Sequence, residues 1–290
     1  MSTWESASLS GLHDRRVRSD SHLRDEVRER VLREAQDLLS GHGLTVSLSH
    51  LNFDEVIARS GVPRTTAYRV WPRKERFLED LLRRLADECS PYGGVLDPAS
   101  AEAALDALDA LADHLETPEG RWLTLVEVCR VASQHHFKDA GSAPPWRTYL
   151  ALIATLRSLG DDPLSQDILE RVRRTETTAI TAMAATYETI VGVVGYRLRD
   201  LPGAFAALTH VGAATAEGML LLADLRPRAF APLGEIDPFQ TGHAAPWSIA
   251  AIGYTSALIG LLEPDPAFDV TSARARLAAR SAARENQTAI

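Results

Sequence analysis

The sequence has few of the features that mark secreted, disulfide-linked or membrane proteins. Only two of its 290 residues are cysteine, Cys89 and Cys129, too few for a disulfide framework or a four-cysteine zinc site. The first twenty residues contain no apolar stretch of the signal-peptide type. The longest apolar stretches, at 190–196 and 247–262, are shorter than the roughly 20 residues that a membrane span needs. We expect a cytoplasmic protein without a membrane partner.

Common enzyme motifs are also missing. The chain has no Gly-x-Gly-x-x-Gly sequence, P-loop, Gly-x-Ser-x-Gly elbow or His-Glu-x-x-His pair. It has no Glu-x-x-His pair of the kind that binds di-iron centres in helical bundles. His135 and His136 lie near Cys129 in sequence, but adjacent histidines point in different directions on a helix. We expect no enzyme, no bound metal and no cofactor.

Acidic residues outnumber basic residues in the whole chain, but one segment is strongly basic. The chain has 31 basic and 39 acidic residues, a net charge of −8, which as a bulk figure argues against nucleic-acid binding. Residues 1–90 hold 15 basic and 15 acidic side chains, so the excess of acid lies after residue 90. Segment 59–76 holds six basic residues and one acidic residue, a local balance of plus five. A basic site is therefore predicted within an acidic protein.

Apolar residues recur at helical spacing along almost the whole chain, and strand signals are absent. With 45% hydrophobic and 24% charged residues, the chain has the composition of a packed globular protein. We therefore expect an all-α fold. Four helices are predicted before residue 90. Six helical blocks are predicted after it, at 101–115, 121–135, 145–159, 163–198, 204–225 and 246–262.

Segment 53–70 has the pattern of two short helices joined by a tight turn. Asn52 is placed to cap the first helix and Gly61 to end it. Pro63 suits the start of the second helix, which Trp71 and the proline after it would end. Two helices so arranged, the second one basic, are typical of a helix-turn-helix, whose second helix enters the major groove of DNA.

The second of these helices and its flank carry the candidate DNA contacts. They are Arg64, Thr65, Thr66, Tyr68, Arg69 and Lys74. Arginine can bind two acceptors on guanine and threonine offers a hydroxyl and a methyl, so the two arginines and Thr65 suit base contacts. The other three suit phosphates. The alternative for the basic stretch is a solvated helix face. For Trp71 a core position is the preferred interpretation.

The order of residues from Gly61 to Phe77, GVPRTTAYRVWPRKERF, closely resembles the helix-turn-helix signature of the tetracycline-repressor (TetR) family of bacterial transcription regulators. The match covers about residues 23–85. Its most telling positions are Gly61, Tyr68, Trp71, Pro72, Lys74 and Phe77. The resemblance implies a dimeric, all-helical protein whose N-terminal domain binds a palindromic operator. A divergent C-terminal domain would bind a small molecule.

The resemblance also assigns roles to single positions. Backbone-contacting positions are Thr66, Tyr68 and Lys74, and base-facing positions are Arg64, Thr65, Arg69 and Val70. The chain departs from the family pattern at Asp54 and Glu55, where many members place hydroxyl or basic residues. Val70 lies where a polar residue is frequent, so we expect it to make an apolar contact, for example with a thymine methyl.

The expected domains follow from these patterns. We predict a flexible N-terminal arm at 1–22, a helix-turn-helix DNA-binding domain at 23–90, a helical effector-binding and dimerisation domain at 91–270, and a disordered tail at 271–290. Arg15, Arg16 and Arg18 in the arm suit a minor-groove contact. A solvated tail is the favoured alternative for them.

The C-terminal part supplies candidates for a ligand pocket. They are Trp122, Cys129, Trp146, Tyr187 and His210, with ordinary core packing as the alternative for each. Segment 211–220 is rich in small residues and resembles the dimer-forming element of TetR-like proteins, with an internal hairpin as the alternative. We therefore expect a ligand-responsive transcription regulator, most often a repressor in this family, that binds operator DNA as a homodimer. The alternative is a helical interaction protein that has lost DNA binding.

Overall fold

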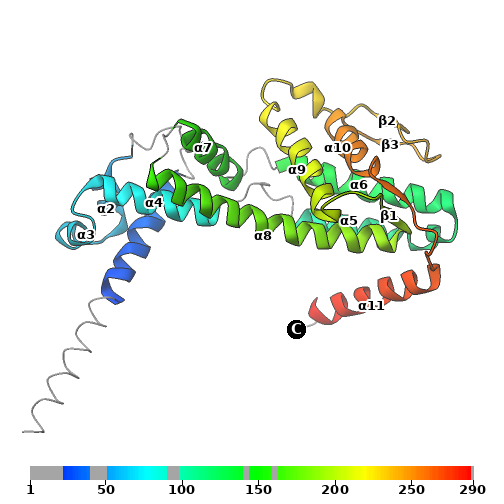
Figure 1. Cartoon of the computed structure of the whole chain (residues 1–290), viewed down its shortest axis with the longest axis horizontal. Helices are drawn as coiled ribbons and strands as arrows, with labels where there is room; N and C mark the ends of the chain where they lie inside the picture. The colour runs from blue at the N-terminus through cyan, green and yellow to red at the C-terminus, as the bar shows by residue number, and fades with distance from the viewer. Residues whose placement is uncertain (1–21, 40–50, 90–97, 140–143, 159–161, 289–290) are drawn as a thin grey trace, which may run out of the picture. The chain divides into compact units, whose positions relative to one another are not determined.

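The computed structural model describes residues 22–39, 51–89, 98–139, 144–158 and 162–288 (Figure 1). These residues are predominantly helical, which confirms the predicted all-α class at that level. The chain forms two compact units, residues 1–89 with 147–173, and residues 90–146 with 174–290. Most of the predicted N-terminal arm, including Arg15, Arg16 and Arg18, lies outside the described residues.

The first unit contains a helix at residues 22–39, α2 (Phe53–Ser60), α3 (Arg64–Val70) and α4 (Lys74–Glu88). It also contains most of α7 (Pro144–Ser158) and the first part of α8 (Pro163–Val193). These elements share one apolar core. Its members include Val31, Val56, Leu81, Leu152 and Ile168. Segment 147–173 thus joins the N-terminal helices in one compact unit, although the predicted DNA-binding domain ends at residue 90.

Local sequence sets the bounds of α2 and α3 as predicted. The Asn52 side chain accepts hydrogen bonds from the backbone N–H groups of Asp54 and Glu55, at 3.0 and 3.4 Å. Gly61 ends α2 with φ +66°, a left-handed conformation that glycine adopts without strain. The Pro63 carbonyl accepts from the first turn of α3, and extended backbone at Trp71 ends that helix. The predicted cap, stop and turn are confirmed.

The second unit contains α5 (Pro98–Ala110), a 3-10 helix at Ala112–Glu116, α6 (Pro118–Asp139) and the remainder of α8. They are followed by α9 (Ala204–Leu221), a 3-10 helix at Pro227–Ala229, α10 (Ile249–Ile259) and α11 (Val270–Thr288). Helix α6 packs against α5 and α10, and α10 packs against α9. Two short antiparallel pairs, which the sequence did not indicate, complete the unit. They are β1 (Tyr196–Leu198) with β4 (Leu262–Pro264) and β2 (Glu235–Ile236) with β3 (Ala245–Pro246).

The predicted helical block at 163–198 is therefore too long. Gly195 follows α8 with φ +77°, and a side chain there would lie 2.6 Å from Cδ of Arg121. This left-handed glycine ends the helix and turns the chain into β1. Arg197 of β1 then pairs with Glu263 of β4, with 2.7 Å between Nη2 and Oε1.

Where the sequence predicts a disordered tail at 271–290, the structure has α11. Asp269 caps this helix by accepting hydrogen bonds from the backbone N–H groups of Thr271 and Ser272. Ala273 and Leu277 are buried. Arg274 forms ion pairs with two acidic residues at 2.6 and 2.8 Å. The tail is rich in alanine, which has the highest helix propensity of any residue. The Asp269 cap stabilises the helix further.

Candidate functional sites

Helix α3 is fixed to the first unit by aromatic packing. Trp71 is 1% exposed, and its ring makes edge contacts with those of Phe53 and Phe77 at centroid distances of 6.1 and 5.6 Å. Its indole N–H donates to Oδ2 of Asp80 at 2.8 Å. Ala67 is fully buried beneath α3. This confirms the predicted core position of Trp71 and fixes which face of α3 is turned outward.

The outward face carries the polar candidates for DNA contact. Arg64, Thr65 and Arg69 are exposed. Thr66 and Tyr68 are half-buried, and Tyr68 packs near Phe53 with a centroid distance of 5.5 Å. Val70 is half-buried and packs against the core of the unit, while Lys74 is half-buried at the first position of α4. The candidates therefore lie on α3 and at the start of α4.

Some arginines of the basic segment 59–76 form ion pairs with described residues, and others do not. Nε of Arg59 lies 2.7 Å from Oε1 of Glu34, and Nη1 of Arg76 lies 3.0 Å from Oε2 of Glu79. The hydrogen bond to Glu34 also raises the pKa of Arg59. Arg69 and Arg73 are exposed and form no ion pair with any residue that the structure describes.

Asp54 at the start of α2 contacts two of the DNA-binding candidates. Its Oδ2 accepts from Nη2 of Arg64 at 3.0 Å, and its Oδ1 accepts from the Tyr68 hydroxyl at 3.0 Å. The Arg64 guanidinium also lies 5.4 Å from the centre of the Tyr68 ring. The acid at this position, noted in the sequence as a departure from the family pattern, thus orients two side chains of α3.

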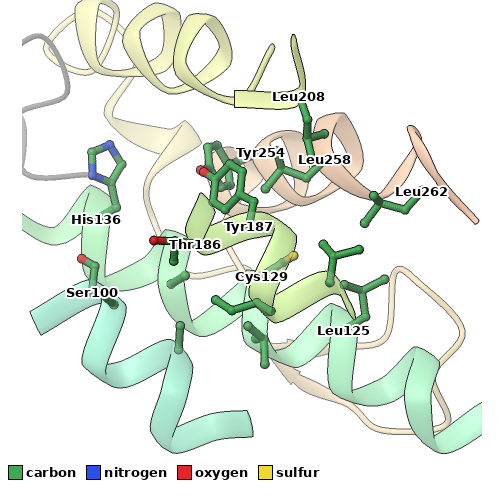
Figure 2. A pocket seen from close by; sticks show the side chains of 16 residues that line it. Ser100, Leu125, Cys129, His136, Thr186, Tyr187, Leu208, Tyr254, Leu258 and Leu262 are labelled. Carbon is green, nitrogen blue, oxygen red and sulfur yellow. The ribbon is translucent and has the colours of Figure 1, made fainter. Parts of the chain in front are cut away.

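The second unit encloses an apolar pocket that extends over about 780 Å³, open solvent at its mouth included. Sixteen described residues line it, and none of them is Asp, Glu, Lys or Arg. They come from α5, α6, α8, α9, α10 and β4, and Figure 2 shows ten of them by name. The lining therefore contains no permanently charged side chain.

The polar groups of the pocket lie on one side of it. Figure 2 shows Ser100, His136 and Thr186 toward one side, and Leu208, Leu258 and Leu262 toward the other. Tyr187 and Tyr254, which contribute the hydroxyl groups nearest the middle, are hydrogen-bonded to each other. The polarity of the lining therefore changes along the pocket.

The ionisable groups in the middle of the pocket are held neutral. Burial raises the pKa of the Cys129 thiol to about 12. Burial likewise raises the pKa of the Tyr254 phenol to about 12, against the opposing effect of its hydrogen bond with Tyr187. At neutral pH both groups are protonated, so the middle of the pocket presents an uncharged surface.

Of the five residues predicted for a pocket, the structure brings two together in it. Cys129 and Tyr187 line the cavity. Trp122 is half-buried and donates its indole N–H to the Phe239 carbonyl at 2.8 Å, Trp146 is buried elsewhere in the unit, and His210 is exposed on α9.

Sequence reasoning missed Ser100, Thr186 and Tyr254 as pocket residues. His136, considered above as a metal ligand, also lines the pocket. Ser100 and Thr186 are small polar residues within apolar helices, and periodicity alone does not show which helix faces meet. No group of three or more His, Cys, Asp and Glu side chains is placed to hold a metal ion among the described residues.

Helix α9 carries an exposed apolar face. Gly212 of this helix is buried against Leu258 and Tyr254 of α10, so part of the small-residue segment 211–220 joins the two helices within one chain. Val211 and Leu221 are 40% and 60% exposed on the other side. Among the described helices α9 alone has the length and hydropathy to cross a membrane, but a single such helix is weak support for a membrane span and is compatible with a soluble protein.

Comparisons with protein-family models, with curated proteins and with solved structures find no match to this chain. The function proposed below therefore rests on the residues of these sites and on the resemblance of segment 61–77 to the TetR signature.

Proposed function

We propose that the chain is a sequence-specific DNA-binding transcription regulator, a ligand-responsive repressor of the TetR type that acts in the cytoplasm. The observation that carries the proposal is α3 itself. It is a short helix after a tight turn, fixed by Trp71 and Ala67 on its inner face, with Thr65 and Arg69 exposed on its outer face. This is the arrangement that a recognition helix needs, because base contacts require side chains that project from a rigid support.

In the proposed complex the outer face of α3 enters the major groove. Arg69 is exposed and has no ion pair with the described residues, so it can bind a guanine without giving up a protein contact. Thr65 reaches the next base edge. Thr66 and Lys74 contact phosphates, the latter from the positive N-terminal end of α4.

The proposed active species is a homodimer. Val211, Ala214, Gly218 and Leu221 recur on α9 at helical spacing and are all exposed. Helix α9 also carries little charge, because Glu217 is the only Asp, Glu, Lys or Arg in it. Burial, with a smaller effect of Glu176, raises the pKa of Glu217 to about 7. An exposed apolar face of this kind suits a second copy of the same helix.

Ligand response is assigned to the apolar pocket. Helix α8 is continuous from Pro163 to Val193. Its first part belongs to the first unit, and Thr186 and Tyr187 in its later part line the pocket. An effector that binds two conformations of the protein unequally would change its affinity for DNA, with a coupling free energy of typically about 1 to 3 kcal/mol.

Binding of the purified protein to the intergenic DNA beside its own gene tests the proposal. We expect a mobility shift that weakens steeply as salt rises, because phosphate contacts release counterions. Arg69→Ala should weaken binding to the preferred site by about fivefold to 150-fold, as expected for loss of a guanine contact of about 1 to 3 kcal/mol.

Arg228→Ala is the matched control. Arg228 is an exposed arginine of the second unit, outside the proposed DNA surface, and its loss removes the same charge. We expect it to leave the affinity within about twofold of the parent protein. Binding that is absent, or that does not depend on salt, would contradict the regulator function and favour a helical interaction protein.

A further inference from the structure

We propose that the pocket of the second unit binds an uncharged amphiphile, a molecule with one hydrogen-bonding head group and an elongated apolar body, whose head lies at Ser100. Only the assignment of this ligand as an effector of DNA binding rests on the proposed function. The binding itself concerns the second unit and can be measured without DNA.

The residues of α6 that line the pocket show which of its ends is polar and which is apolar. Leu125, Cys129 and His136 lie on one face of this helix, at spacings of four and seven residues. Eleven residues of helix advance by about 16 Å, so the polar end at His136 and the apolar end at Leu125 are well separated. Figure 2 shows the same order, with His136 and Leu125 on opposite sides of Cys129.

Ser100 marks the position of the head group. This side chain is 3% exposed, and its Oγ has no hydrogen-bond partner among the described residues. A buried hydroxyl without a partner is costly, and a ligand oxygen at this position would satisfy it. By contrast, the Tyr187 and Tyr254 hydroxyls satisfy each other, and Thr186 donates to the Ala182 carbonyl at 3.1 Å.

The opposite end accommodates the apolar body. Leu208, Leu258 and Leu262 line it from α9, α10 and β4. The lining offers a carboxylate no Arg or Lys and offers an ammonium group no Asp or Glu. A charged head would lose its hydration in a lining that has no permanently charged side chain, so the head should be a hydroxyl, an amide or another neutral group.

Decanol is a suitable probe, with decanoate and decylammonium as charged ligands of matched length. We expect decanol to bind at least about tenfold more tightly than either ion, by calorimetry and by the rise in melting temperature. Shortening the chain from decanol to octanol should weaken binding by about fourfold per methylene, because each buried methylene contributes by its transfer free energy.

Ser100→Ala tests the head position. We expect this variant to bind decanol about fivefold more weakly, as for the loss of one hydrogen bond. Its melting temperature without ligand should equal or exceed that of the parent protein, since its Oγ has no partner to lose. Ser256→Ala on the exposed face of α10 is the control and should bind decanol like the parent.

Two outcomes would overturn the inference. Tighter binding of decanoate or decylammonium would show that the pocket selects a charged head, and unchanged decanol affinity in Ser100→Ala would show that the head lies elsewhere. Absence of DNA binding in the mobility-shift experiment would not affect either result, so failure of the regulator function is distinguishable from failure of this proposal.

Discussion

At the scale of single residues, Asp54 is the acidic side chain that bears most directly on the proposed DNA surface. It is 47% exposed and holds Arg64, itself 68% exposed. Exposed ion pairs of this kind contribute little to stability. Asp54 instead orients Arg64 and Tyr68, and in the proposed complex it would place a negative charge near the DNA phosphates.

Asp54→Asn should therefore change affinity and specificity for DNA in opposite directions. We expect affinity for non-specific DNA to rise by roughly threefold to tenfold, because a charge that repels phosphates is removed. The ratio of specific to non-specific affinity should fall, because Arg64 is no longer held by a charge-assisted hydrogen bond. Fluorescence anisotropy with a preferred site and a scrambled site measures both quantities.

Glu55→Gln provides the matched control for that experiment. Glu55 is the exposed neighbour of Asp54, and its side chain forms no hydrogen bond or ion pair with α3 among the described residues. The same change of charge should raise non-specific affinity and leave the specificity ratio unchanged. Equal ratios in the two variants would exclude an orienting role for Asp54.

The residues of the α2–α3 turn were predictable because their roles are local. Asn52 and Gly61 act through local backbone geometry, and Trp71 contacts residues no more than eighteen positions away. The Asp54 contacts and the pocket position of Ser100 depend on which helix faces meet. One sequence carries no direct signal for either of them.

At the scale of secondary-structure elements, α4 and the first part of α8 are joined by a ladder of charges. Nε of Arg83 lies 2.6 Å from Oδ2 of Asp167, and Nε of Arg171 lies 2.9 Å from Oδ1 of the same carboxylate. Arg171 also pairs with Asp87 of α4 at 2.6 Å. The hydrogen bonds from Arg83 and then Arg171 lower the pKa of Asp167. One carboxylate thus connects α8 to the helix that follows α3.

Asp167→Asn should reduce the free energy of unfolding by about 1 kcal/mol at pH 7, a value discounted for the partial exposure of the group. A lowered pKa means that this contribution is complete above the ordinary Asp pKa of about 3.9. It is lost as pH falls below that value and through the lowered pKa of the folded state. Urea unfolding at pH 7 and at low pH, with the difference between the two proteins as the readout, measures it.

Glu170→Gln is the control for the ladder. Glu170 is exposed on the same helix and makes no ion pair with the described residues, so its loss should leave stability unchanged at both pH values. A stability difference for Asp167→Asn that persists undiminished at low pH would show that packing, rather than charge, explains it.

Helical periodicity predicted the existence of most elements but not their grouping. Segments 147–158 and 163–173 were expected as helices, yet their place beside α4 follows from Leu152, Ile168 and the charges at Asp167. The two-residue and three-residue strands are too short to produce an alternating pattern. Backbone geometry at Gly195 and pairing with distant segments determine them.

At the scale of the whole molecule, the proposed dimer makes a prediction about association. Leu221→Glu places a charge on the exposed apolar face of α9 and should weaken dimerisation by about tenfold or more, since that charge would have to be buried in the interface. Light scattering during gel filtration measures the mass. Leu233→Glu, at an exposed leucine outside α9, should leave the mass of the parent protein unchanged.

The proposed dimer also predicts the spacing of the two half-sites in the operator. In the proposed complex, two copies of α3 related by a twofold axis would read half-sites about 34 Å, or one helical turn, apart. Inserting about five base pairs between the half-sites turns them to opposite sides of the duplex, so affinity should fall to that of a half-site, and inserting about ten should restore part of it. Leu221→Glu should bind all three spacings equally weakly. If the parent protein binds all three equally well, each copy reads DNA alone and the exposed face of α9 serves another contact.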